Sequence, residues 1–268
     1  MLNFCSLYSG SSGNSFFVQS NCAKILVDIG LSSKKIILAL ESINIKPSSL
    51  DGILITHEHS DHVQGLGVFI KKYNIPLYID KTTFSAIKES YTKGIDNNNV
   101  HFITIGETFN LKDLIIHPFA TPHDAANPCG YTITKGDKKI SIATDIGNMT
   151  DNILHCLEHS CFILLESNYD PAVLQCANYP YSLKTRIAGP TGHLSNQSAG
   201  KTLSHLIDYG LTHAMLGHLS KESNFPELAY TTVMDELISN KKENNFQLSV
   251  AKRDSCSKLI ELEQEILC

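Results

Sequence analysis

Six consecutive residues carry much of the chemistry that this sequence can perform. They are His57, Glu58, His59, Ser60, Asp61 and His62, and they follow the apolar run at 53–56. Imidazole nitrogens and carboxylate oxygens are ligands that Zn²⁺ and related ions accept. His57 and His59 project to the same side of an extended backbone, because side chains alternate there with a period of two. One metal ion could take this pair, and a second could take Asp61 and His62.

Four further segments repeat one pattern, an apolar stretch that ends in a metal-binding side chain. The residues that end these stretches are Asp28, His123, Asp145 and His218. Taken singly, an Asp or His after a strand is usually a turn residue or a cap. Strand ends at one edge of a sheet can nevertheless converge in space, and the six-residue cluster needs partners to complete two metal shells. We therefore expect these four residues to join it.

Apolar periodicity predicts strands and helices in both halves of the chain. The expected strands are 16–18, 25–27, 51–56, 76–79, 100–105, 114–121, 130–135, 139–144, 162–166 and 214–216. The expected helices are 33–43, 62–73, 82–90, 151–158, 195–209 and 226–239. The segments 246–251 and 259–262 alternate like a closing hairpin. This α/β pattern suits two sheets packed face to face with helices outside.

Composition narrows the range of partners. The net charge of −5 argues against binding nucleic acid through overall charge, although it excludes neither a local basic groove nor a metal site that supplies positive charge. Arg186 and Arg253 are the only arginines, so bidentate clamps on phosphate are scarce. None of the eight cysteines forms a C-x-x-C pair, which favours reduced thiols and a cytoplasmic protein. We recognise neither a signal peptide nor a membrane span.

The ordered set of Asp28, the run 57–62, His123, Asp145 and His218 resembles the five motifs of the metallo-β-lactamase-fold hydrolases. The stretches 8–15, 56–65, 143–147, 192–196 and 216–220 also resemble the YycJ/WalJ-like branch, which is associated with metal-dependent phosphodiesterase or 5′-to-3′ exonuclease activity on DNA. The resemblance implies one domain over residues 1–268. It also implies a four-layer αββα sandwich with a two-metal site at the edge between the sheets.

The resemblance further assigns a role to each ligand. One metal would be held by His57, His59 and His123, the other by Asp61, His62 and His218, with Asp145 bridging the two. Asp28 would hydrogen-bond a ligand histidine and fix its orientation. The expected cofactors are two divalent ions per chain, Zn²⁺ first, with Mn²⁺ or Fe also compatible. Asp61 would hold the nucleophile, a metal-bridging hydroxide that attacks phosphorus.

Two positions separate reaction classes within that family. The bridging residue is Asp145, where true zinc β-lactamases carry Cys, which disfavours lactam hydrolysis. The second histidine of the first pair is His59, where the flavodiiron relatives carry Glu, which favours hydrolysis over redox chemistry.

Two loops are candidates for binding substrate. His193, Ser195 and Asn196 precede an expected helix, whose N-terminus is a natural phosphate site, and His193 could bind the scissile phosphate or protonate the leaving oxygen. The alternative is an ordinary helix cap after a Gly/Pro-rich loop. In the loop 9–15, Ser11 and Asn14 could contact substrate, or the loop could be a tight turn between strands.

The interpretation that follows is a cytoplasmic two-metal phosphodiesterase, a 5′-to-3′ exonuclease on DNA, without a membrane or an obligate protein partner. A first alternative is a hydrolase of a small ester, thioester or cyclic phosphodiester on the same fold. A second is a metal-binding regulatory protein without turnover, against which the complete ligand set argues. A lysine-lined groove leading to the metals would favour the nuclease.

Overall fold

The first half of the chain builds a seven-stranded sheet (sheet 1) that the last strand completes. The computed structural model describes residues 1–262. The strand order is β14-β1-β2-β3-β4-β5-β6, in which β3 to β6 run parallel and the pairs β14–β1, β1–β2 and β2–β3 are antiparallel. The bounds are β1 (Leu2–Tyr8), β2 (Ser15–Ser20), β3 (Lys24–Val27), β4 (Gly52–Leu54), β5 (Leu77–Asp80), β6 (Val100–Ile103) and β14 (Ile260–Leu262).

The second half builds sheet 2, also of seven strands, in the order β13-β12-β11-β10-β9-β8-β7. Here β10 to β13 run parallel, and β7, β8 and β9 form antiparallel pairs. The bounds are β7 (Phe109–Leu111), β8 (Leu114–Ala120), β9 (Cys129–Lys135), β10 (Lys138–Ala143), β11 (Phe162–Glu166), β12 (His213–Gly217) and β13 (Gln247–Val250).

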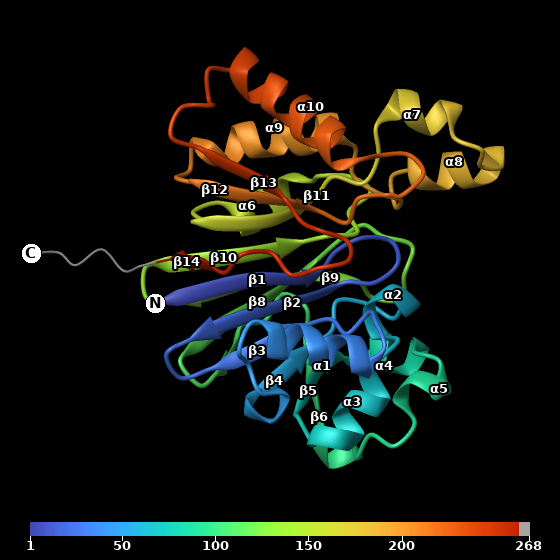
Figure 1. Cartoon of the computed structure of the whole chain (residues 1–268), viewed down its shortest axis with the longest axis vertical. Helices are drawn as coiled ribbons and strands as arrows, with labels where there is room; N and C mark the ends of the chain where they lie inside the picture. The colour runs from blue at the N-terminus through green and yellow to red at the C-terminus, as the bar shows by residue number, and fades with distance from the viewer. Residues whose placement is uncertain (263–268) are drawn as a thin grey trace, which may run out of the picture.

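The two sheets pack face to face, and helices cover their outer faces (Figure 1). Alternate residues of β1, such as Leu2 and Phe4, join the core between the sheets, while Cys5 and Leu7 join the core under the helices of sheet 1. A third core lies between sheet 2 and its helices. This is the expected four-layer αββα sandwich, and it follows from strands that are apolar on both faces.

Four helices lie on the side of sheet 1: α1 (Ser33–Ser42), α3 (Leu66–Tyr73), α4 (Lys81–Ala86) and α5 (Glu89–Thr92) (Figure 1). Three lie on the side of sheet 2: α6 (Asp151–Leu157), α9 (Asn196–Ile207) and α10 (Pro226–Ser239). The short helices α2 (Ser60–Val63), α7 (Pro171–Cys176) and α8 (Tyr181–Ile187) lie at one end of the sandwich, with 3₁₀ turns at Pro47–Ser49 and Asn97–Asn99 elsewhere. Within residues 1–262, no helix is both long and apolar enough to cross a membrane.

The structure corrects the expected closing hairpin. Strand β13 runs parallel to β12 in sheet 2, whereas β14 runs antiparallel to β1 in sheet 1, so the two segments belong to different sheets. Alternation shows that a segment is a strand with one buried face, but it does not name the neighbouring strand. The structure also splits the expected helix at 62–73. A side chain at Gly65 would meet the Leu31 carbonyl oxygen at 2.1 Å, so the chain passes close to α1 where α2 ends.

One hydrogen bond ties the two sheets together just before the histidine cluster. The buried hydroxyl of Tyr131 in β9 donates to the carbonyl oxygen of Ile55 at 2.7 Å, two residues before His57. Removing a buried donor leaves its acceptor without a partner, which costs roughly 1–3 kcal/mol.

We therefore expect Tyr131→Phe to lower the free energy of unfolding by about 1–3 kcal/mol, as measured by urea denaturation. The matched control is Tyr181→Phe, because Tyr181 is an exposed tyrosine of α8 and its change should leave stability within about 0.5 kcal/mol of wild type. Equal stability of the two variants would show that the Tyr131 hydroxyl does not brace the sheets.

Candidate metal centre

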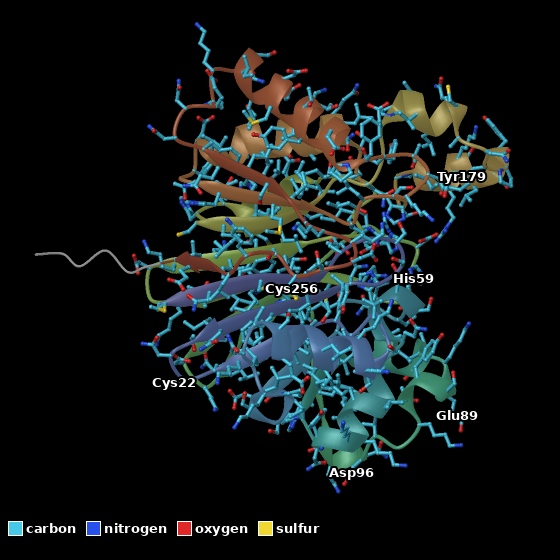
Figure 2. The ribbon with its side chains drawn as sticks, viewed as in Figure 1. Cys22, His59, Glu89, Asp96, Tyr179 and Cys256 are labelled. Atoms are coloured by element: carbon cyan, nitrogen blue, oxygen red, sulfur yellow. The ribbon has the colours of Figure 1, made fainter. Side chains whose placement is uncertain are left out.

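All the residues expected to bind metal lie at one edge of the sandwich. Asp28 follows β3, the run 57–62 follows β4 and enters α2, His123 follows β8, Asp145 follows β10 and His218 follows β12. These strands present their carboxyl ends at this edge, as ligand-binding open sheets commonly do. Figure 2 shows His59 beside α2, at the end of the sandwich where the two sheets meet.

Three of these strand-end residues adopt a left-handed backbone conformation. The φ angles are +63° at Asp28, +58° at Asp145 and +55° at His218. This region is uncommon for residues other than glycine, and Asp and His are among those that tolerate it. The backbone thus turns sharply where each strand ends. Conformations of this kind cost about 1–3 kcal/mol and cluster at functional sites.

Three imidazoles form the first half of the centre. His57 Nε2 lies 3.1 Å from His59 Nδ1, and His123 Nε2 lies 3.3 Å from the same nitrogen. His57 and His123 are almost fully buried, and His59 is half-buried at the mouth of the site. Three nitrogens that face one point form the ligand set of a metal ion such as Zn²⁺.

Asp61, His62 and His218 form the second half. Asp61 Oδ2 lies 3.5 Å from His62 Nε2 and 3.4 Å from His218 Nε2. Asp145 lies between the halves, with Oδ1 3.7 Å from His123 Nε2 and Oδ2 3.3 Å from His62 Nε2. The seven expected ligands therefore converge in overlapping groups, and Asp145 lies near members of both halves.

Outer hydrogen bonds orient the ligand histidines. His62 Nδ1 lies 2.7 Å from Asp28 Oδ2. His123 Nδ1 lies 3.0 Å from the Gly192 carbonyl oxygen, and His218 Nδ1 lies 2.9 Å from Glu166 Oε1. Since these partners accept hydrogen bonds, each Nδ1 carries the hydrogen and each Nε2 faces the centre. Asp28 is itself fixed, because its oxygens accept from the backbone and side chain of Thr56 at 2.9 Å.

The protonation of the centre follows from burial and neighbouring charge. Burial, together with the positive charge of His62, holds the pKa of His57 well below its usual value, and burial likewise lowers the pKa of His59. Burial alone would lower the pKa of His218, but the carboxylates of Asp145, Asp61 and Glu166 raise it to about 10. For the same reason, nearby imidazoles outweigh burial at Asp145 and hold its pKa well below the usual range. Asp61 and Asp145, whose pKa values are lowered, are therefore ionised and attract positive charge, whereas burial raises the pKa of Asp28.

The residues present fit divalent metal ions. The ligand atoms within each group lie no more than 4.8 Å apart, and the Oδ2 atom of Asp145 is buried without a hydrogen-bond partner. A buried carboxylate oxygen of this kind is costly unless a cation or donor satisfies it. The absence of a thiolate ligand among the seven makes the set compatible with Zn²⁺, Mn²⁺ and Fe²⁺ alike.

Glu166 is a member of the centre that the sequence analysis missed. Its side chain is fully buried, and Oε1 accepts hydrogen bonds from His218 Nδ1 at 2.9 Å and His193 Nδ1 at 2.8 Å. Oε2 accepts from the backbone N–H groups of Ile146 and Leu194. A usable signal was present, because Glu166 ends the apolar strand β11 just as the other site residues follow theirs.

The loop before α9 reaches the centre through His193. The His193 ring lies 5.1 Å from His123 and 5.3 Å from His218 between centroids, and its Nδ1 is held by Glu166. Ser195 instead caps α9, since its hydroxyl accepts from the N–H of Ser198. Asn196 is buried and bonded to Ser167 and Asn224, so a contact with phosphate would require this network to open. The phosphate contacts of Ser195 and Asn196 remain predictions.

The loop 9–15 separates its two predicted contact residues. Ser11 is exposed at the loop tip. Asn14 is fully buried, and its Nδ2 lies 3.1 Å from His62 Nε2 and 3.4 Å from Asp61 Oδ2. Its Oδ1 accepts from the N–H of Gly10 at 2.9 Å, which fixes the amide among the ligands. The structure thus places Asn14 against the metal ligands, and a contact of Ser11 with substrate remains a prediction.

A pocket of about 360 Å³ opens at the mouth of the centre. Its walls include His59, Asp61, Lys88, Tyr91 and Arg186. Arg186 comes from α8 and forms a bidentate pair with Asp124, the residue after ligand His123. The α7–α8 segment, which the sequence analysis did not predict, is therefore anchored at the rim of the centre.

Comparison with known proteins assigns this arrangement to a family. The model of the beta-lactamase superfamily domain matches residues 24–219. The chain is 41% identical to exodeoxyribonuclease WalJ of Streptococcus pneumoniae over 232 residues, which cover 86% of each protein. It is 34% identical to exodeoxyribonuclease YycJ of Bacillus anthracis over 236 residues, 88% of this chain and 89% of the relative. The solved structure of Zn²⁺-bound PqqB from Methylobacterium extorquens superposes with a TM-score of 0.71 at 15% identity, over 97% of this chain and all of the other, which reflects a shared fold.

The chain belongs to the beta-lactamase superfamily and has the metallo-β-lactamase fold. Within it, the chain is similar to the WalJ and YycJ exodeoxyribonucleases over most of its length. Membership and the converging His/Asp ligands identify it as a metal-dependent hydrolase.

The double change His57→Ala with His59→Ala removes two of the three nitrogens in the first half. We expect elemental analysis to show about two divalent ions in wild type and about one in the variant. The fold should persist by circular dichroism, because the ligands lie at an edge and not between the sheets. The control His155→Ala removes an exposed histidine of α6 and should retain both ions. Wild type that binds no ion after reconstitution with Zn²⁺, Mn²⁺ or Fe²⁺ would refute the metal centre.

Proposed function

We propose that the protein is a two-metal phosphodiesterase that removes nucleotides from DNA, in the 5′-to-3′ direction. The observation that carries the proposal is the shared carboxylate Asp145 between two sets of converging ligands, on a fold built for hydrolysis. The similarity to two exodeoxyribonucleases over more than four-fifths of the chain supports DNA as the substrate. Seven free cysteines within residues 1–262 support a reduced, cytoplasmic setting.

In this proposal one ion would be held by His57, His59 and His123. The other ion would be held by Asp61, His62 and His218, and Asp145 would bind both ions. Two such ions would lower the pKa of a water between them and stabilise the charge that develops on the phosphoryl oxygens. Asp61 would hold the attacking water, since its carboxylate is partly exposed and lies 3.4–3.5 Å from His218 and His62 of the second half. Asp28, Asn14 and Glu166 keep the ligands in register.

His193 is placed to act on the leaving group. Glu166 fixes its Nδ1, which leaves Nε2 for a substrate oxygen, and its side chain is 15% exposed beside the ligands. A histidine held by a buried carboxylate is a suitable proton donor, because the carboxylate orients the ring and stabilises the imidazolium.

A panel of substrates tests the proposal. The protein reconstituted with Zn²⁺ or Mn²⁺ should release mononucleotides from 5′-phosphorylated single-stranded DNA and should hydrolyse bis-p-nitrophenyl phosphate. RNA, a thioester and a lactam complete the panel. Faster turnover of the thioester or of a cyclic phosphodiester than of DNA would favour the alternative of a small-molecule hydrolase. No turnover of any substrate by metal-loaded protein would favour a regulatory protein.

Asp61→Ala should reduce phosphodiester turnover by several orders of magnitude, because the variant loses both a metal ligand and the group that orients the water. Thermal stability of the metal-free protein should change little. The matched control Glu89→Ala removes an exposed carboxylate from α5 and should retain activity. Near-normal turnover in Asp61→Ala would mean that another residue positions the nucleophile.

His193→Ala should leave metal content unchanged and lower turnover of DNA, whose leaving oxygen needs a proton, by roughly 10²–10⁴-fold. Bis-p-nitrophenyl phosphate has a good leaving group and should be affected far less. A residue that only binds phosphate would instead raise KM for both substrates alike. Wild-type kinetics on both would remove His193 from the site.

A further inference from the structure

A groove of about 610 Å³ lies beside the metal centre, in the size range of roughly 300–1,000 Å³ that is typical of ligand clefts. Two loops and the start of a helix form its walls: residues 219–221 after ligand His218, residues 224–226 at the start of α10, and residues 250–255 after β13. We call it the basic groove, because Lys221, Lys252 and Arg253 line it against one acidic residue, Asp254.

The basic groove adjoins the backbone of the second half of the metal centre. Ser9 lines the groove, and its hydroxyl accepts a hydrogen bond from the backbone N–H of His218 at 2.9 Å. Leu219, the next residue after this ligand, is also part of the wall, and its carbonyl oxygen accepts from Arg253 at 2.6 Å. A ligand in the groove would therefore lie next to the loop that carries His218.

The cations of the groove are not neutralised by the protein. A few lysines form ion pairs, such as Lys112 with Asp51 and Lys135 with Asp113, so the feature that sets the groove apart is the gathering of three cations along one cleft. Within residues 1–262, neither Lys221 nor Lys252 nor Arg253 has a carboxylate partner. In a chain of net charge −5, unpaired cations gathered beside the metal centre favour an anionic ligand.

Arg253 also holds the groove together. Its guanidinium packs over Gly10, where an added side chain would meet it at 2.6 Å, and it bonds to Leu219. It thus braces the loop 9–15 and the loop after His218, which leaves Lys221 and Lys252 as the freely exposed cations.

At the far wall, the ring of Phe225 is 49% exposed at the start of α10. A cationic groove with an exposed aromatic ring is the combination that binds single-stranded nucleic acid, in which phosphates meet the cations and a base stacks on the ring. An acidic peptide would use the cations but has no need of the ring.

We propose that the basic groove binds the single-stranded part of a DNA substrate next to the scissile phosphate, with Lys221 and Lys252 on phosphates and Phe225 stacked on a base. This proposal rests on the proposed nuclease function and adds the path of the strand. The proposal is also compatible with the negative net charge of the chain, because the positive charge that would bind the DNA is concentrated in the groove.

The test measures binding apart from cleavage. Metal-free protein in chelator is titrated into a fluorescent single-stranded DNA of about twelve nucleotides, and anisotropy gives Kd at several salt concentrations. Lys221→Glu with Lys252→Glu should weaken binding, and Lys221→Gln with Lys252→Gln should lower the salt slope by about 1.4. Phe225→Ala should weaken binding about ten-fold with an unchanged salt slope.

The matched control is Lys46→Glu with Lys241→Glu, which makes the same charge change at two exposed lysines remote from the groove. Lys46 precedes β4 at the end opposite the metal centre, and Lys241 follows the far end of α10. Equal losses of affinity in the control and the groove variant would overturn the proposal. So would a poly-glutamate peptide that binds wild type as tightly as DNA does.

Cleavage assays separate the two proposals. If the groove variants bind DNA like wild type while wild type digests it, the groove is wrong and the nuclease function stands. If wild type binds DNA through the groove but never cleaves it with metal present, the groove stands and the nuclease function is wrong.

Discussion

The burial of several carboxylates at one edge of the sandwich is the constraint on which the rest of this structure depends. Asp28, Asp145 and Glu166 have almost no exposed surface, and an isolated ion there would cost several kcal/mol. Glu166 is well compensated, because it binds two histidines and two backbone N–H groups. Asp28 is compensated only in part, because burial raises its pKa although it binds Thr56 and His62. Asp145 retains an oxygen without a donor. The surrounding imidazoles already favour the ionised form of Asp145, and a bound cation would satisfy its remaining oxygen.

The strain at this edge depends on the rigidity of the two sheets. Left-handed turns at Asp28, Asp145 and His218 are unfavourable in isolation, and each comes within two residues of the end of a largely buried strand. The apolar cores therefore hold the turns, and the turns aim the side chains at the centre. The bond from Tyr131 to Ile55 keeps the two sheets in register near the histidine run. The positions of the side chains at the metal centre therefore depend on the packing of the two sheets away from it.

The fold and the ligand set were predicted from the sequence mainly through the resemblance to the metallo-β-lactamase-fold hydrolases, and local patterns supported both. Apolar strands that end in Asp or His are visible along the chain, and four of the five strands that carry them have a parallel neighbour, whereas β8 before His123 pairs antiparallel on both sides. Glu166 shows the limit of that reasoning, since its strand was predicted but its role was not. A glutamate indicates a metal site less strongly than a histidine does, and Glu166 hydrogen-bonds the histidines rather than joining the expected metal ligands. The sheets that β13 and β14 join could not be predicted, because the alternation of apolar and polar residues does not indicate the neighbouring strand. The α7–α8 segment was missed because its helices are too short to show a clear period.

The distribution of charge could not be read from composition either. An overall charge of −5 suggests a poor surface for nucleic acid, yet the two arginines and several lysines border the metal centre. The two arginines differ in use, since Arg186 is paired with Asp124 at the rim and Arg253 binds backbone and braces two loops. Carboxylates elsewhere on the protein make the net charge negative, but dissolved salt screens their electrostatic influence beyond about 10 Å at ordinary ionic strength. A strand bound at this edge would respond to the cations of the groove and to the metal ions, and hardly to the acidic residues of the outer helices.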